Sequence, residues 1–94
     1  MPHRIRTHPG EVLREEYLEP LGLSARHLAA VLGVPGNRIS DIVRERRGVT
    51  ADTAIRLGRY FKTDARFWLN LQLSHDLSKA EADTDYSCVP TRVA

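Results

Sequence analysis

The stretch LSARHLAAVLGVPGNRISDIVRERRG, residues 23–48, decides the fold of this 94-residue chain. Its apolar residues recur at the spacing of three and four that is typical of helices with one buried face: Leu28, Val31 and Leu32 in the first half, and Ile39, Ile42 and Val43 in the second. Gly33 can adopt a positive φ without the steric penalty of a Cβ, so it predicts a sharp turn between the two. Two short helices joined by such a turn are typical of a helix-turn-helix, whose second helix enters the DNA major groove.

The second helix of this pair carries the residues that we expect to contact bases. Because Ile39 and its apolar neighbours point inward, Asn37, Arg38, Ser40 and Asp41 are predicted to point outward. Asparagine and arginine have paired hydrogen-bonding groups that match adenine and guanine edges. Asn37 and Arg38 also lie at the N-terminal end of the helix, where such motifs contact base edges. Asp41 could reach the same groove, but we favour the interpretation that it orients Arg38 or Arg44.

Positive charge is concentrated around the same motif. The whole chain has a net charge of only +2, yet residues 26–66 hold nine Arg or Lys against four Asp or Glu, and both flanks are acidic. Four arginines are expected to contact phosphates, one at the start of the first helix of the motif and three at or after the end of the second: Arg26, Arg44, Arg46 and Arg47. Such contacts add affinity and salt dependence without sequence choice.

The rest of the pattern predicts one all-α domain of five helices with flexible termini. Residues 1–7 are expected to form an arm, residues 8–78 the helix-turn-helix domain, and residues 79–94 a polar, disordered tail. Pro9 suits the start of the first helix, and Pro20 is expected to stop it. Ser24, Thr50 and Asp64 are expected to cap the second, fourth and fifth helices. The fifth helix is predicted over residues 65–74.

The first and last helices carry the expected protein contacts. The fifth helix holds Phe67, Trp68 and Leu71, an apolar load that indicates either enclosure on most sides or a dimer surface. Aromatic enrichment favours the dimer surface. The first helix has an acidic exterior whose glutamates include Glu15, Glu16 and Glu19.

Several function classes have no support in the sequence. The single cysteine, Cys88, cannot form an intramolecular disulfide, and there is neither an apolar run of roughly 20 residues nor an N-terminal secretory signal. We therefore expect a cytoplasmic protein without membrane contact. The four histidines show no metal-ligand spacing with Cys88, so no metal and no cofactor is predicted. His75 and Asp76 could be drawn as an oriented base, but adjacent helical residues point to different faces and no nucleophile is placed beside them. We expect no catalytic residue and no enzyme.

Longer motifs add a family resemblance that covers nearly everything from residue 8 to residue 81. They read HPGE at 8–11, EPLGLS at 19–24, NRIS at 37–40, TADTAIRL at 50–57 and FWLNLQ at 67–72. With these motifs the chain resembles the HigA-type antitoxins, which are Xre-class repressors with a lambda-repressor-like fold. The resemblance implies a homodimer that binds a palindrome in its own promoter and neutralises a HigB-like mRNA interferase. The acidic residues Glu15, Glu16 and Glu19 are then either the surface that meets this small basic toxin or an ordinary solvated helix face.

Three positions depart from the pattern of these antitoxins. Glu45 and Lys62 stand where glycine often occurs, after the recognition helix and after the fourth helix, and His75 stands where tyrosine is frequent. Glu45 puts an acid beside Arg44 and Arg46, which weakens the phosphate interpretation of those arginines. Two alternatives stay open: a stand-alone repressor without a toxin, and an interaction protein whose helix-turn-helix no longer binds DNA.

Overall fold

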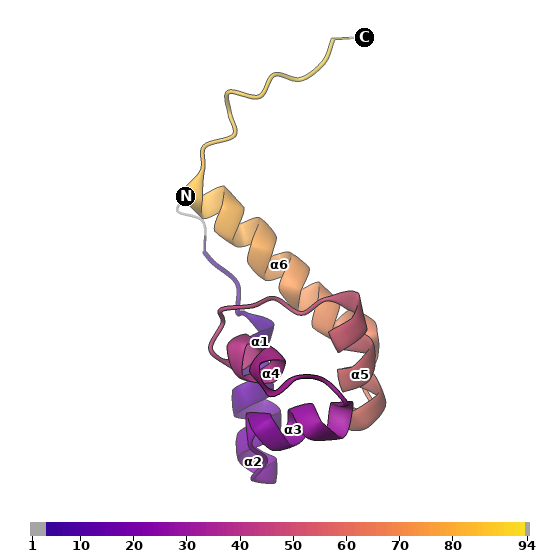
Figure 1. Cartoon of the computed structure of the whole chain (residues 1–94). Coiled ribbons are helices and arrows are strands. Elements are labelled where there is room, and N and C mark those ends of the chain that lie inside the picture. The colour runs from indigo at the N-terminus through magenta and orange to yellow at the C-terminus, as the bar shows by residue number, and fades with distance from the viewer. Residues whose placement is uncertain (1–3, 94) are drawn as a thin grey trace.

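The computed structural model describes residues 4–93, and every regular element in that range is a helix. The chain forms five helical segments (Figure 1). In chain order they are a first segment made of α1 (Pro9–Val12), η1 (Leu13–Leu18) and α2 (Glu19–Leu21), then α3 (Ala25–Leu32), α4 (Gly36–Val43), α5 (Ala51–Phe61) and α6 (Ala65–Asp83). The predicted all-α fold of five helices is confirmed.

The first segment does not stop at Pro20, contrary to the prediction. The helix continues to Leu21, and Gly22, with φ 66°, ends it. Between Leu13 and Leu18 the backbone forms a π-helix, in which the Glu19 amide donates to the Arg14 carbonyl five residues earlier. Proline has no amide hydrogen and its ring crowds the preceding turn, so a locally wider turn accommodates Pro20 without ending the helix.

The helix-turn-helix forms as the sequence predicts. Gly33 adopts φ 74°, and the Val34 amide donates to the Ala29 carbonyl, which closes the turn between α3 and α4. Ser24, Thr50 and Asp64 each accept a hydrogen bond from a backbone amide at the start of α3, α5 and α6, so all three predicted caps are confirmed.

The core lies between these helices. Its largest fully buried hydrophobic side chains come from all five segments: Leu13, Leu28, Ile39, Ile42, Leu57 and Trp68. Val31 is an exception to the predicted inward face of α3, because 45% of it is exposed. Its side chain instead borders a shallow surface recess between α3 and α5.

Helix α6 is nearly twice as long as predicted. It runs for 19 residues to Asp83, so residues 79–83 of the expected tail are helical. The segment before α1 lies beside this helix (Figure 1). There the Arg6 amide donates to Ser78 Oγ, and His75 Nδ1 donates to the Arg6 carbonyl at 2.7 Å. The predicted arm is therefore held against α6 at Arg6, whereas the chain after Thr84 leaves the end of α6 as an extended segment.

Within residues 4–93, none of the helices has both the length and the apolar character needed to cross a membrane.

Candidate DNA-recognition surface

Helix α4 carries its polar residues on the side opposite its buried apolar face. Ile39 and Ile42 are completely buried, which fixes the rotation of the helix. Asn37 is exposed, whereas Arg38 and Asp41 are half-buried. The predicted base-contact residues thus share one short helix, with Asn37 and Arg38 in its first turn. Ser40 is also half-buried, and its hydroxyl donates to the Asn37 carbonyl.

The orientation of Arg38 differs from the prediction. Its Nη1 atom lies 2.9 Å from Oδ2 of Asp52, in the first turn of α5. Asp41 does not orient Arg38 or Arg44; its carboxylate lies 3.8 Å from Nη2 of Arg47. The two side chains point in different directions. Arg38 extends from α4 toward α5, where it meets Asp52, whereas Asp41 extends toward the loop after α4, where it meets Arg47.

Asp52 is a functional candidate that the sequence reasoning missed. Hydrogen bonding from Arg56, one turn further along α5, is the main cause that lowers the pKa of its carboxyl group, and Arg38 lowers it further. The signal for the α5 pair was present in the sequence, because Asp52 and Arg56 are four residues apart on one helix. The contact with Arg38 crosses between two helices, so no local spacing indicates it.

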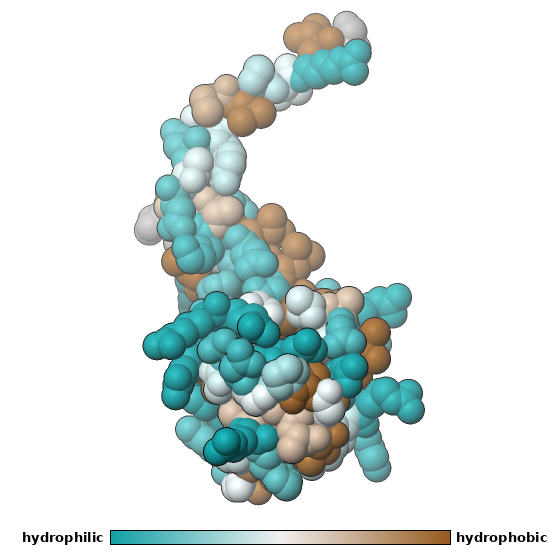
Figure 2. All heavy atoms as spheres, viewed as in Figure 1, coloured by the Kyte–Doolittle hydropathy of each residue, from teal (hydrophilic) through white to brown (hydrophobic). Residues whose placement is uncertain are grey.

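The predicted phosphate contacts surround α4 as exposed cations. Arg44, Arg46 and Arg47 occupy the loop that follows α4, and Arg26 lies in the first turn of α3. Hydrophilic side chains gather over this part of the molecule in the space-filling view (Figure 2). A recess between α4 and α5 joins this loop to the base-contact region, and it is lined by Arg38, Arg47, Gly48, Thr50, Asp52 and Thr53.

Glu45 does not neutralise the arginines on either side of it. It adopts φ 61°, a conformation that turns the chain sharply and that favours glycine. Its carboxylate lies 3.9 Å from Arg14 Nη1, on the first helical segment. The acid therefore pairs within the fold, and Arg44 and Arg46 remain exposed.

The first helical segment supports α4 from behind. Gly10 packs so tightly that a Cβ there would lie 1.8 Å from the Ile42 carbonyl oxygen. His8 caps α1 by accepting the Gly10 amide on Nδ1 at 2.8 Å, and the Arg14 guanidinium donates to the Val43 carbonyl. These contacts hold the C-terminal end of α4 while its N-terminal end stays open.

Trp68 corrects the predicted dimer surface. It is fully buried, and its indole Nε1 donates to Thr63 Oγ1 at 2.9 Å. Its ring also lies beside Tyr17, with 5.2 Å between ring centroids. Trp68 is therefore a core residue of a single chain. Phe67, which is 39% exposed, and the half-buried Leu71 are the other predicted members.

The remaining predicted residues lie away from α4. Glu15, Glu16 and Glu19 are exposed on the first helical segment. Asp76 accepts a hydrogen bond from Gln72, whereas His75 donates to the Arg6 carbonyl, so the two side chains do not form an oriented catalytic base.

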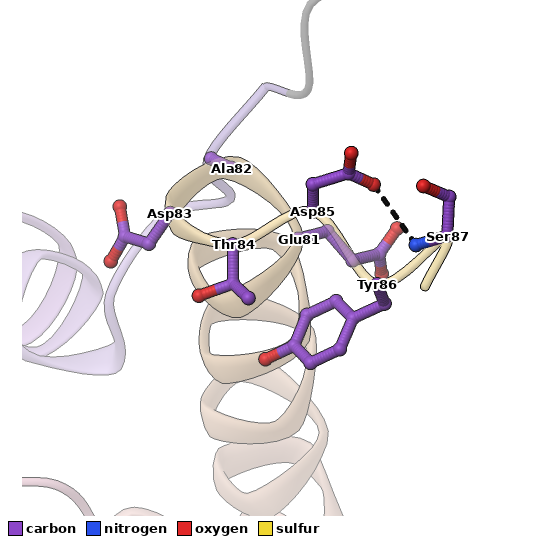
Figure 3. A pocket seen from close by; sticks show the side chains of 7 residues that line it. All are labelled: Glu81, Ala82, Asp83, Thr84, Asp85, Tyr86 and Ser87. Atoms are coloured by element: carbon purple, nitrogen blue, oxygen red, sulfur yellow. Dashed lines mark hydrogen bonds between the residues drawn. The ribbon is translucent and has the colours of Figure 1, made fainter. Parts of the chain in front are cut away.

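A surface hollow at the C-terminal end of α6 does not have the arrangement of side chains that a binding site needs. Figure 3 shows seven consecutive residues around it, Glu81 to Ser87. Asp85 accepts the Ser87 amide at 2.9 Å, while Asp83 and Tyr86 point in different directions. No group of side chains converges there on a common point, so we place no site in it.

A tight turn followed by a recognition helix, with exposed arginines near that helix, is the arrangement that defines a helix-turn-helix DNA-binding protein. The helix-turn-helix family model matches residues 15–68, which is more than half of the chain. The chain is 63% identical over 76 residues to virulence-associated protein I of Dichelobacter nodosus, covering 81% of this chain and 70% of that protein.

Two solved structures are similar over most of the chain. Antitoxin HigA of Pseudomonas aeruginosa with the higBA promoter has a TM-score of 0.82 and 51% identity, covering 85% of this chain and 86% of that one. Antitoxin GraA in complex with its operator has a TM-score of 0.88 and 43% identity, covering 100% and 98%. The chain belongs to the helix-turn-helix family and, within it, to the HigA-type antitoxins. Membership of this non-enzymatic family confirms that the chain is not an enzyme.

Proposed function

We propose that this chain is the antitoxin of a type II toxin–antitoxin module, which binds its own operator as a homodimer and neutralises a HigB-like toxin in the cytoplasm. One observation carries the proposal: the exposed α4 surface belongs to a chain that is 51% identical to an antitoxin solved with the higBA promoter. The supporting experiment is co-expression with the product of the neighbouring open reading frame. A stable complex, with the neighbour toxic when expressed alone, supports the proposal. A harmless neighbour that does not bind leaves a stand-alone repressor.

Operator binding assigns different roles to two arginines. Arg38 lies in the first turn of α4, where base edges are contacted, whereas Arg47 lies in the exposed loop behind it. Arg38→Ala is expected to abolish discrimination between the operator and a scrambled duplex. Arg47→Ala is expected to weaken both duplexes by a similar factor and to flatten the salt dependence by about one unit. Equal losses on both duplexes for both variants contradict this assignment.

The homodimer is supported by an apolar face on α6. Leu73 is 57% exposed and Leu77 is 54% exposed, and the two are four residues apart on this helix, which places them on one side of it. Apolar side chains are visible along α6 in Figure 2. Phe67 and Leu71 add apolar surface on a neighbouring side of the helix, and a twofold dimer would bury these patches against the same residues of the second copy. Such a dimer would place two α4 helices about 34 Å apart, which matches one turn of DNA.

Sedimentation velocity tests this face. The double variant Leu73→Asp with Leu77→Asp is expected to sediment as a monomer, while Leu21→Asp, a matched change at a residue that is 59% exposed, is expected to leave the dimer intact. A wild-type chain that stays monomeric with and without operator rules out the dimer geometry.

Toxin binding is supported by the exposed acids of the first helical segment. Glu15, Glu16 and Glu19 are solvent-accessible and lie outside the DNA-recognition surface, so a basic partner can reach them. Charge reversal of Glu15 and Glu16 is expected to weaken toxin binding, with Glu81→Lys on α6 as the matched control. Unchanged affinity in the double variant removes these acids from the toxin surface.

A further inference from the structure

Asp52 joins three elements of the helix-turn-helix through one carboxylate oxygen. Its Oδ2 atom accepts from Arg38 Nη1 at 2.9 Å and from Arg56 Nε at 3.0 Å. Arg56 in turn donates through Nη1 to the Leu32 carbonyl at 2.7 Å, at the end of α3. The recognition helix, the start of α5 and the last turn of α3 are thus linked through two guanidinium groups.

This carboxylate stays charged and accessible. The hydrogen bond from Arg56 lowers the pKa of Asp52, so the group is ionised at neutral pH. Its position in the first turn of α5 also suits an anion, because the unpaired amides of a helix N-terminus carry partial positive charge. The Asp52 side chain remains 58% exposed and borders the recess between α4 and α5.

The contact leaves Arg38 able to bind a second group. A guanidinium has five N–H donors in a rigid fork, and Asp52 engages Nη1. Bidentate recognition of guanine needs two donors held in one plane, and a long side chain that is already oriented loses less conformational freedom when it binds. The Arg38 side chain is 29% exposed, so the fork is only partly covered in the free protein.

We propose that Asp52 is a positioning residue that determines operator specificity: it orients Arg38 for base recognition without itself contacting a base. This inference rests on the proposed operator binding. Asp52 has a second effect, because a negative charge beside the recognition helix repels phosphates on every DNA sequence. The repulsion weakens operator and non-specific binding alike, so only the orientation of Arg38 raises the ratio of operator affinity to non-specific affinity.

The test is Asp52→Asn, which keeps the shape of the side chain and removes its charge. Dissociation constants are measured by fluorescence anisotropy for the operator duplex and for a scrambled duplex of equal length, at several salt concentrations. We expect tighter binding to the scrambled duplex, weaker binding to the operator, and a specificity ratio lower by about tenfold, the discrimination typical of one oriented bidentate contact. Asp83→Asn is the matched control, because Asp83 is an exposed partner of Lys79 at the far end of α6.

A double-mutant comparison separates positioning from a structural role. In an Arg38→Ala background, Asp52→Asn is expected to leave the remaining specificity ratio unchanged, because no side chain is left to orient. If Asp52→Asn changes that ratio equally in both backgrounds, or changes affinity for both duplexes by the same factor, the positioning role is overturned. A wild-type chain that binds the two duplexes equally refutes the proposed operator binding itself, which is a different result.

Discussion

Gly10→Ala gives the sharpest prediction about how the recognition helix is held. The methyl group would lie 1.8 Å from the Ile42 carbonyl oxygen and 2.8 Å from the Ile42 carbonyl carbon, both of them backbone atoms in α4. Real Cβ contacts stay beyond 3.0 Å, so the first helical segment must move away from α4 by more than 1 Å. A rotamer change cannot relieve this clash, because the obstructing atoms belong to the main chain.

The movement disturbs several contacts at once. The methyl group also lies 3.0 Å from His8 Nδ1, the atom that accepts the Gly10 amide. Separation from α4 further loosens the Arg14 bond to the Val43 carbonyl and the packing beneath Leu13. Overpacking of a tight core costs about 1–3 kcal/mol, and a clash with backbone belongs at the upper end. We therefore expect a loss of about 3 kcal/mol in the free energy of unfolding, or about 15 °C in Tm.

Urea unfolding followed by circular dichroism measures this loss. Gly36→Ala is the matched control, because a Cβ at Gly36 meets no atom within 4 Å and its φ is not positive. That control is expected to be neutral or to stabilise the protein by up to about 1 kcal/mol. If Gly10→Ala unfolds within about 0.5 kcal/mol of the wild type, the close approach of α1 to α4 is wrong and so is the account of how α4 is supported.

Three further predictions concern stability. Lys62→Gly is expected to raise the free energy of unfolding by about 1 kcal/mol, since Lys62 has φ 59°; thermal unfolding measures this, and a loss of stability contradicts it. Burial and the nearby His75 lower the pKa of His8 below its usual value of 6.5, so the unfolded chain takes up a proton before the folded chain does as the pH falls. The free energy of unfolding is therefore expected to be unaffected by His8 above about pH 6.5 and to decrease below it. Urea midpoints at pH 8 and pH 5 check this, and the decrease is expected to shrink in His8→Asn. Trp68→Ala is expected to cost about 4 kcal/mol in urea unfolding, whereas a loss below about 1 kcal/mol contradicts its place in the core.

The parts of the fold that were predictable depend on local chemistry. Gly33 and the Ser24 cap act within a few residues of their own position, so spacing and residue type were sufficient to predict them. The glycine preference at positions 45 and 62 likewise has a local cause, because both residues adopt a positive φ.

The parts that were missed depend on contacts that the sequence pattern does not display. The second half of α6 has no continuous buried face; the Lys79 pair with Asp83 and the bonds from Arg6 support it instead. Trp68 fits a core and an interface equally well by spacing alone, and only the packing against Tyr17 assigns it to the core. The link between Asp52 and Arg38 joins two helices, and no periodicity predicts such a pair.

The most direct test of the central claim is selection of bound duplexes from a random pool by the full-length chain, followed by sequencing. The account predicts an enriched inverted repeat whose half-sites are centred about 10 base pairs apart. It also predicts that Arg38→Ala loses the enrichment while Arg47→Ala keeps the motif with weaker binding. Absence of any enriched sequence, or an Arg38→Ala variant that selects the same motif with the same strength, contradicts recognition of operator DNA through α4.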